Sequence, residues 1–241
     1  MAIMGNLSMD AKYHECVKAK SLAEFFMFVA RRRIHDDFIR LCRPAVSDTI
    51  LDVGVSDVME DTANTFERLY PYHEKVTATG LGEGRNIRML FPDINYVQVS
   101  PGEPLPFDNK SFDIVVSNAV LEHTGGHSER NLFVKELLRV ACTVFITVPN
   151  RYFFVEHHTA IPFLHFFDTT FHLACKMTNK IHWASERNLI LTSKKMLSTH
   201  MPDGMHVHIC YTGLPLGLFS SNLYLHARPG KKRIPQGRIQ A

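Results

Sequence analysis

Two polar strand ends carry the residue types from which a ligand site could be built. The first, residues 50–56, reads Ile-Leu-Asp-Val-Gly-Val-Ser, an apolar run that ends in an acid and a glycine. Open α/β sheets bind nucleotide-like ligands at the carboxyl ends of their strands, and a glycine there lets the backbone approach the ligand closely. Asp52 and Gly54 are therefore candidate binding residues, although an ordinary strand-to-loop turn has the same composition.

The second strand end lies in residues 105–123, which read LPFDNKSFDIVVSNAVLEH. A turn leads into an apolar strand, and the strand ends in polar residues that include Asn118 and His123. An unperturbed imidazole titrates at about pH 6.5, so His123 is a candidate general base. Equally, Glu122 and His123 could simply cap the loop before Thr124.

Five further histidines crowd residues 151–183, at positions His157, His158, His165, His172 and His182. A helical zinc pair needs two histidines four residues apart with a carboxylate partner, and these spacings do not supply one. We therefore expect no metal centre, and we interpret the histidines either as the lining of a polar and aromatic substrate pocket or as hydrogen-bonding groups within the lid. His157 and His158 are added to His123 as candidate catalytic residues.

The same segment is rich in phenylalanine, and three explanations stay open for it. Residues such as Phe163 and Phe166 could cover an apolar acceptor, or they could be an ordinary core, which is the commoner role of closely spaced aromatic residues. If exposed, they would form a membrane-contacting or dimer surface. About thirty residues are too few for an independent core, so this segment is expected to be a lid packed on the sheet.

The elements that must hold these residues alternate between helix and strand. Residues 21–42 have apolar positions at helical spacing, and Pro44 ends that helix. A crossover helix is predicted over 128–140, with Ser128 as its N-cap. Short apolar runs predict five buried parallel strands and two later strands: 49–53, 75–79, 95–99, 112–117, 143–148, 205–212 and 221–227. This order indicates an α/β sheet covered on both sides.

Composition limits the class of protein. The 241 residues carry a net charge of +3, but Arg228 and four later basic residues supply +5, so residues 1–227 carry −2. No basic stripe is available to hold a nucleic acid. Five widely spaced cysteines suggest neither a disulfide framework nor a zinc ribbon, and the amino terminus lacks the pattern of a signal peptide. We expect a cytoplasmic protein without a transmembrane segment.

Residues 105–123 and the preceding ILDVG resemble two motifs of the class I S-adenosylmethionine-dependent methyltransferases, in particular the small-molecule type that includes ubiquinone and menaquinone methyltransferases. Residues 136–167, with a strand that ends in Pro-Asn-Arg and an aromatic segment, are similar to one subgroup. The resemblance implies a Rossmann-like sandwich with a seven-stranded, mostly parallel sheet and an antiparallel last strand. The resemblance covers residues 45–227, which are the expected methyltransferase domain. From the residues themselves we expect a helical cap over 1–44, a lid at 151–183 within the domain, and a flexible basic tail over 228–241.

The resemblance assigns binding roles residue by residue. The loop after the first strand, with Asp52, Gly54, Val55 and Ser56, would hold the donor S-adenosylmethionine, and Asn118, Ala119 and Val120 would line its sulfonium. The glycine-rich loop departs from the family pattern at Ser56 and Val58. No acid follows the second strand at Gly80 or the third at Pro101, so Glu83 and Glu103 are the nearest substitutes for the residues that usually hold the nucleoside. The acceptor is expected to meet lid residues: Asn150, Arg151, Glu156 and Phe163.

The resulting prediction is methyl transfer to an oxygen, nitrogen or carbon nucleophile of a small molecule, such as a secondary metabolite or a glycan or lipid precursor, which leaves S-adenosylhomocysteine. The alternative is a methyltransferase fold that has lost catalysis and serves as a binding or scaffold subunit. Peripheral membrane contact and a homodimer stay open. Transfer of a methyl group can proceed by alignment alone, so a catalytic base is not required.

Overall fold

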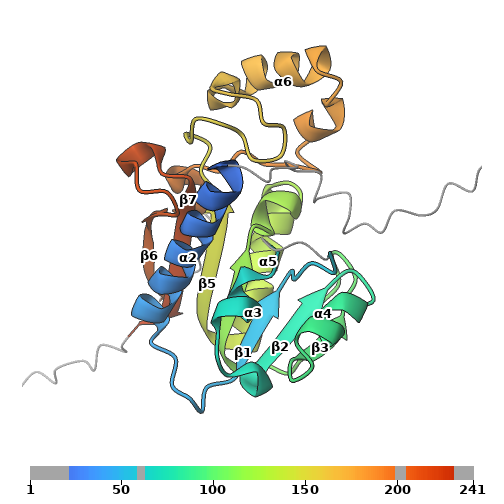
Figure 1. Ribbon diagram of the computed structural model, residues 1–241, viewed down its shortest axis with the longest axis vertical. Helices are drawn as coiled ribbons and strands as arrows, with labels where there is room; N and C mark the ends of the chain where they lie inside the picture. Colours follow the sequence, from blue (N-terminus) through green and yellow to red (C-terminus); the bar gives the residue numbers. More distant parts are fainter. Residues whose placement is uncertain (1–21, 59–62, 199–204, 231–241) are drawn as a thin grey trace, which may run out of the picture.

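The computed structural model describes residues 22–58, 63–198 and 205–230, and these form a seven-stranded mixed sheet with helices on both faces (Figure 1). The strand order is β3-β2-β1-β4-β5-β7-β6. The strands are β1 (Ile50–Val53), β2 (Val76–Gly80), β3 (Asn95–Gln98), β4 (Phe112–Asn118), β5 (Ala141–Pro149), β6 (Met205–Thr212) and β7 (Asn222–Pro229). The last strand, β7, lies between β5 and β6 and is antiparallel to both, while β1–β5 pair in parallel. The predicted sheet is therefore confirmed.

Helices cover the sheet and join its strands. They are α2 (Leu22–Cys42), α3 (Thr65–Leu69), α4 (Arg85–Leu90), α5 (His127–Val140), α6 (Asp168–Met177) and α7 (Lys194–Ser198). Short 3₁₀ turns are η1 (His73–Lys75), η2 (Leu121–His123), η3 (Leu164–Phe166), η4 (Ile181–Ala184) and η5 (Gly217–Phe219). The helix predicted before Pro44 ends at Cys42, as expected when a proline follows closely. The tail beyond residue 230 and the first 21 residues of the predicted cap lie outside the described residues.

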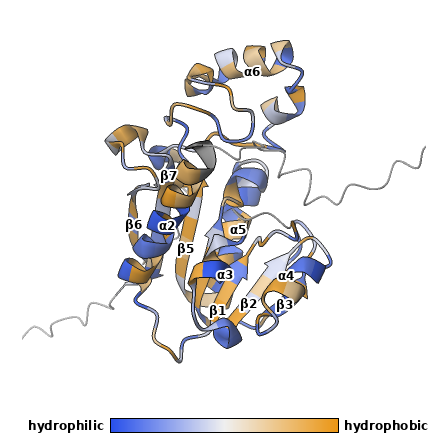
Figure 2. Ribbon diagram, in the orientation of Figure 1, coloured by the Kyte–Doolittle hydropathy of each residue, from blue (hydrophilic) through white to orange (hydrophobic). Residues whose placement is uncertain are grey.

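Side-chain alternation along the strands builds two cores, one on each face of the sheet. On one face, Leu51 and Val115 pack with Leu137 of α5. On the other, Ile50 and Ile114 pack with Phe38 of α2, which is 1% exposed. The strand β5 is accordingly mostly hydrophobic (Figure 2). Helix α2 thus packs directly on the sheet, and no separate core divides it from the rest of the fold.

Two local expectations are wrong. Ser128 does not cap α5: the N-cap is Gly126, and the Ser128 hydroxyl instead donates to Glu129 at 2.9 Å from within the first turn. The lid does not lie flat on the sheet: α6 stands beyond the carboxyl ends of the strands (Figure 1). It closes a small cluster of its own, in which Phe171, Cys175 and Trp183 are buried. This cluster forms because residues after the lid, such as Leu189, return to complete it.

Candidate functional site

The loop after β1 lies in direct contact with the end of β4. Gly54 has φ +102°, and a Cβ placed on it would stand 2.1 Å from Cγ2 of Val120. Only glycine fits both the backbone conformation and the available space. The first and fourth strand ends, which the sequence marked separately, therefore form one continuous wall at the carboxyl edge of the sheet.

The backbone of this loop is held from two sides. The amides of Gly54 and Val55 both donate to the Thr79 carbonyl oxygen, at 2.8 and 2.9 Å. The Ser56 amide donates to Oδ1 of Asn64 at 2.9 Å, and Nδ2 of Asn64 donates back to the Ser56 carbonyl at 2.7 Å. Asn64 thus fixes the position of a loop that has serine where the family pattern has its second glycine.

Asp52 points away from the open edge and toward α3. Its side chain is buried, and its carboxyl group shares a hydrogen bond with Glu67, which is 1% exposed. Burial raises the pKa of Asp52 well above its ordinary value, and the neighbouring Glu67 raises it further. Burial also raises the pKa of Glu67. Burial and the contact with Glu67 therefore both disfavour the charged form of Asp52.

The predicted nucleoside acids are on the surface. Gly80 ends β2 beside Gln98, with which it is in register. The side chain of Glu83 is 64% exposed and forms an ion pair with Arg85 at 2.6 Å. Glu103 is exposed as well. Neither acid is held toward the strand ends by a buried contact, so any role in ribose or adenine binding requires them to turn toward the ligand.

The end of β4 is shaped by an unusual backbone. Ala119 has φ +56°, a conformation that few residues other than glycine adopt. Its amide donates to the Thr147 carbonyl at 2.9 Å, and the Thr147 hydroxyl donates to Oδ1 of Asn118. Backbone strain of this kind is concentrated at functional sites. It turns the chain from β4 into η2 and so brings His123 to the sheet edge.

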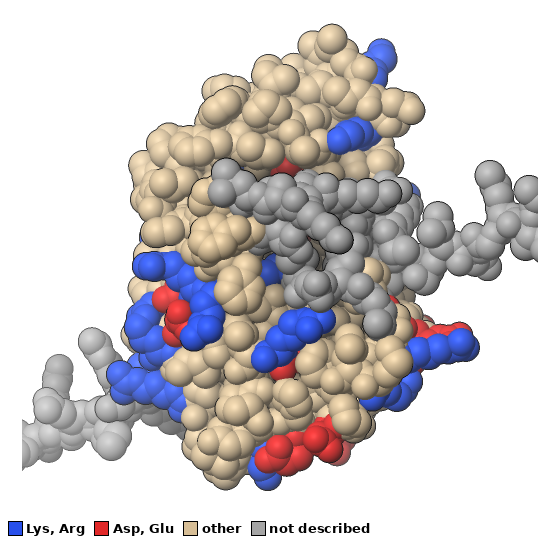
Figure 3. All heavy atoms as spheres, in the orientation of Figure 1, with Lys and Arg blue, Asp and Glu red and all other residues tan. Residues whose placement is uncertain are grey.

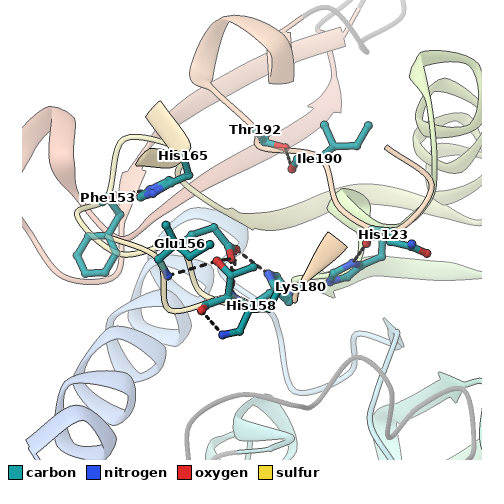
Figure 4. Close-up of polar contacts among 11 residues, drawn as sticks. His123, Phe153, Glu156, His158, His165, Lys180, Ile190 and Thr192 are labelled. Atoms are coloured by element: carbon teal, nitrogen blue, oxygen red, sulfur yellow. Dashed lines mark hydrogen bonds and ion pairs between the residues drawn. The ribbon is translucent and has the colours of Figure 1, made fainter. Parts of the chain in front are cut away.

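His123 meets His158 of the lid at this point (Figure 4). The two ring centroids are 4.7 Å apart and the rings are nearly perpendicular, at 86°. Trp183 packs against His158 with a centroid distance of 4.9 Å. The structure therefore brings together two of the three predicted catalytic histidines, which are 35 positions apart in the chain.

Glu156 holds His158 in place. Its carboxylate, 3% exposed, accepts hydrogen bonds from Nδ1 of His158 at 2.9 Å and from the amide and hydroxyl of Thr159, both at 2.6 Å. Burial alone would raise the pKa of Glu156, but the donors of His158 and Thr159 outweigh it and hold the pKa at about 2. Glu156 is thus an ionised carboxylate that orients an imidazole, rather than a residue that faces the acceptor.

The segment at residues 188–190, after the lid, holds His123 in place. Nδ1 of His123 lies 2.6 Å from the carbonyl oxygen of Asn188, and the Ile190 amide donates to the Glu122 carbonyl at 2.8 Å. Sequence reasoning did not identify Asn188 or Ile190, because they act through backbone atoms, which leave no signal in residue type. Glu122 was noted only as a capping residue, yet its side chain is buried between these segments.

The other lid residues that were predicted to contact the acceptor line a separate small cavity. Asn150, Arg151, Glu156, His157 and His165 help to line a cavity of about 10 Å³, which is room for about one water molecule. It cannot hold an acceptor. Nδ2 of Asn150 donates to the carbonyl groups of Leu218 and Ser220, at 2.9 and 2.8 Å, and Arg151 donates to Asp168 at 2.7 Å.

These contacts change the expected roles of three residues. Asn150 and Arg151 tie the end of β5 to neighbouring loops, so we interpret them as supports of the fold rather than acceptor contacts. His157 lies against Phe153, with ring centroids 5.4 Å apart, and not beside the His123–His158 pair. Burial lowers the pKa of His157 to about 4, so this imidazole is neutral at physiological pH.

Phe163 lies on the outside of the lid. It is 57% exposed, and its ring packs edge-on against Phe166 and lies near Phe154. Phe167, 70% exposed, extends the same apolar area. On the face shown in Figure 3, the part of the molecule formed by the lid has few charged side chains, whereas lysine and arginine gather over the lower part. The aromatic residues thus form both a small core and an exposed surface.

Comparisons with known proteins agree with this arrangement. Residues 51–143 match the family described as a methyltransferase domain. This match covers 93 of the 241 residues. The matched segment runs from β1 to β5 and includes both the Gly54 loop and the β4 end with His123. No curated protein matches the sequence.

Solved structures share the fold of this chain at low sequence identity. The methyltransferase domain of a bacterial protein described as CtHen1-C has a TM-score of 0.56 and 13% identity, with 84% of this chain and all of that chain covered. A putative methyltransferase in complex with the Trm112 activator of Haloferax volcanii has a TM-score of 0.53 and 14% identity, covering 87% of this chain and 94% of that one. The small RNA methyltransferase HEN1 has a TM-score of 0.55 and 11% identity, covering 84% of this chain but 25% of that one.

The fold is that of the methyltransferase domains in these structures. Within the described ranges, the search for membrane-crossing helices found none of sufficient length and apolar character.

Proposed function

We propose that the protein transfers the methyl group of S-adenosylmethionine to an oxygen, nitrogen or carbon nucleophile of a small molecule. One observation carries the proposal: the Gly54 loop touches Val120 at the end of β4, and three residues later His123 faces His158. A donor that binds along the Gly54 loop would thus have its sulfonium beside the imidazoles of His123 and His158. The resemblance to small-molecule methyltransferases supports the same reading of the site.

The reaction is an in-line displacement. The donor supplies a methyl group on a cationic sulfur; as the acceptor's bond to the methyl carbon forms, the carbon–sulfur bond breaks, its electron pair stays on sulfur, and S-adenosylhomocysteine leaves. Asn118, Ala119 and Val120 line the sulfonium with oxygen atoms and apolar groups that do not compete for the methyl group. The His123–His158 pair orients the acceptor and takes up the proton that it loses. Much of the rate comes from alignment of the two reactants.

The donor site of this proposal is atypical, with a loop that lacks the second and third glycines of the family. Gly54, Val55, Ser56 and Gly80 supply a backbone wall whose close approach to Val120 fits a class I donor loop. The carboxyl group of Asp52 contacts Glu67. Asp52 therefore supports the donor site by its position in β1 and not by binding the donor with its charge. Glu83 and Glu103 remain the proposed partners of the nucleoside, although both residues are exposed in the structure.

The proposed acceptor is a small molecule with an apolar part. The exposed lid aromatics, among them Phe163, suit a hydrophobic chain or a lipid surface, and they suit a nucleic acid poorly because few charged groups lie on the lid in Figure 3. The likeness to HEN1, at 11% identity, concerns the fold and does not transfer its substrate. The cytoplasm stays the proposed location, and a homodimer stays possible.

The acceptor class is tested with methyl-labelled donor and a cell extract separated into organic-soluble, protein and RNA fractions. We expect label in the organic-soluble fraction, and less of it with Phe163→Ser than with the wild type. Label confined to RNA would overturn the small-molecule assignment. Label confined to protein would overturn it as well, while leaving methyl transfer itself intact.

A scaffold function is the second candidate, and the Asp52–Glu67 contact favours it together with the absence of an acid at the end of β2. A scaffold would have no use for the donor. Binding of S-adenosylhomocysteine therefore separates the two candidates, because the enzyme must bind this product and the scaffold need not.

A further inference from the structure

Glu122 is a buried carboxylate for which the protein supplies no side-chain partner among its described residues. The residue is 1% exposed, and neither Oε1 nor Oε2 accepts a hydrogen bond there. A buried, unsatisfied carboxylate is costly and calls for a specific explanation, such as an ion.

Two imidazoles stand next to this carboxylate. The ligand atoms of Glu122, His123 and His158 all lie within 4.8 Å of one another. Glu122 and His123 come from η2, and His158 comes from the lid, so the group exists only because the lid folds against the end of β4. Two imidazole nitrogens and one carboxylate oxygen are the protein ligands of many catalytic zinc sites, which keep a fourth position open.

The surroundings of both imidazoles select the nitrogen that can bind a metal. Nδ1 of His158 faces the ionised Glu156 carboxylate at 2.9 Å, and Nδ1 of His123 faces the Asn188 carbonyl at 2.6 Å. Both oxygens are acceptors, so in neutral imidazoles each Nδ1 carries the proton and each Nε2 carries the lone pair. Metal-binding histidines almost always show this pattern, with the second nitrogen donating to a carboxylate or carbonyl group.

We propose that Glu122, His123 and His158 bind one divalent transition-metal ion of the Zn²⁺ class. Mixed imidazole and carboxylate ligands suit Zn²⁺ and its neighbours better than Mg²⁺ or Ca²⁺, which prefer oxygen ligands alone. Glu156 and Asn188 are positioning residues that orient the two imidazoles. The expectation that no metal would bind considered only histidine spacings within the lid, and this group joins two distant segments.

The role of the ion rests on the proposed function, whereas its binding does not. An acceptor oxygen at the open position would be more acidic than a free hydroxyl group, because a bound cation favours the deprotonated form. With the ion bound, the two imidazoles would act on the acceptor through the ion instead of as its base, and the proton that the acceptor loses would pass to solvent. An acceptor with an oxygen nucleophile, such as a phenol or an enol, is therefore favoured over an acceptor with a nitrogen or carbon nucleophile.

The test uses the untagged full chain, freed of metal with a chelator and then titrated with Zn²⁺ or Co²⁺. We expect one ion per chain, and visible absorption bands of four-coordinate cobalt. Glu122→Gln and His158→Gln should each weaken binding at least a hundredfold, and Glu156→Gln should weaken it about tenfold to a hundredfold. His172→Gln removes an exposed lid histidine outside the group and should bind as the wild type does.

Equal metal affinity in the wild type, Glu122→Gln and His158→Gln would overturn the proposal, as would the absence of stoichiometric binding. Circular dichroism of each variant shows whether the fold is retained, and Glu156→Gln keeps all three ligands if a ligand variant unfolds. Parallel titration with S-adenosylhomocysteine separates the outcomes. Donor-product binding without metal binding removes this inference alone, and metal binding without donor-product binding removes the proposed function.

Discussion

The two halves of the sheet's carboxyl edge are built in different ways. On the donor half, the loop after β1 is held by backbone amides and by one close contact, that of Gly54 with Val120. On the other half, buried polar side chains converge from η2, the lid and the segment at 188–190. The donor half can therefore be disturbed by adding a single carbon atom, and the histidine half by removing a single charge.

The largest expected effect is on the histidine half, in Glu156→Gln. The change removes an ionised carboxylate that accepts from both His158 and Thr159, and loss of one partner in a buried charged network costs about 3 kcal/mol. Urea denaturation of wild type and variant measures this difference. Asp168→Asn is the control, because Asp168 pairs with Arg151 on the surface, is 70% exposed, and should cost less than about 1 kcal/mol. Similar losses in the two variants would contradict the buried network.

The donor half should respond next, in Gly54→Ala. The new Cβ meets Val120 at 2.1 Å and φ is +102°, so we expect a loss of about 2 kcal/mol in unfolding free energy. Gly102→Ala is the matched control, since φ is +77° but no atom lies within 4 Å. Gly54→Ala combined with Val120→Ala should recover part of the loss. No recovery would show that the close contact is not the cause.

A smaller effect, of opposite sign, is expected for Glu67→Gln. Burial raises the carboxyl pKa values of Asp52 and Glu67, and the contact with Glu67 raises that of Asp52 further. The wild-type fold therefore loses stability as pH rises from the ordinary carboxyl pKa range to these raised values. The variant removes one of the two charges, so it should be more stable than the wild type by about 1 kcal/mol at pH 8. This gain should shrink toward pH 4, where about half of the unfolded carboxyl groups are also protonated.

Denaturation curves between pH 4 and pH 8 measure this dependence. The exposed Glu74→Gln on the same side of the sheet is the control, and its difference from the wild type should not change with pH. A Glu67→Gln variant that is less stable than the wild type at pH 8 would show that the pair is ionised and supported by other groups.

The smallest effect is expected for Glu83→Ala. Its ion pair with Arg85 is exposed, so stability should change by less than about 0.5 kcal/mol. We also expect affinity for S-adenosylhomocysteine to fall less than about threefold, because the side chain must leave Arg85 to reach a nucleoside. A loss of tenfold or more, measured by calorimetry, would show that Glu83 replaces the missing acid of the second strand.

The fold could be predicted from the sequence because it depends on local patterns of apolar residues and of helix-ending residues. Apolar runs such as 50–53 and 143–148 are buried whichever ligand is bound, and Pro44 ends α2 wherever the helix packs. The misplaced N-cap at Ser128 shows the limit of such rules: a hydroxyl near a helix start can bond within the first turn, here to Glu129, while a glycine occupies the cap.

The site was predicted only where its residues lie in one motif. Gly54 and Val120 sit in recognisable strand ends, whereas the contact of His123 with His158 depends on how the lid folds. Asn150 and His157 have polar side chains typical of a binding site, and yet they support the fold around a cavity the size of one water molecule. Residue type shows that a side chain can bind, but tertiary packing decides what it faces.

Calorimetric titration of the wild-type protein with S-adenosylhomocysteine tests the central claim most directly, with Gly54→Ala measured beside it. We expect saturable binding of one ligand per chain, weakened at least tenfold in Gly54→Ala while Gly102→Ala binds as the wild type does. Absence of binding to the folded wild type at millimolar ligand would contradict a methyl-transfer function and leave the scaffold function in its place.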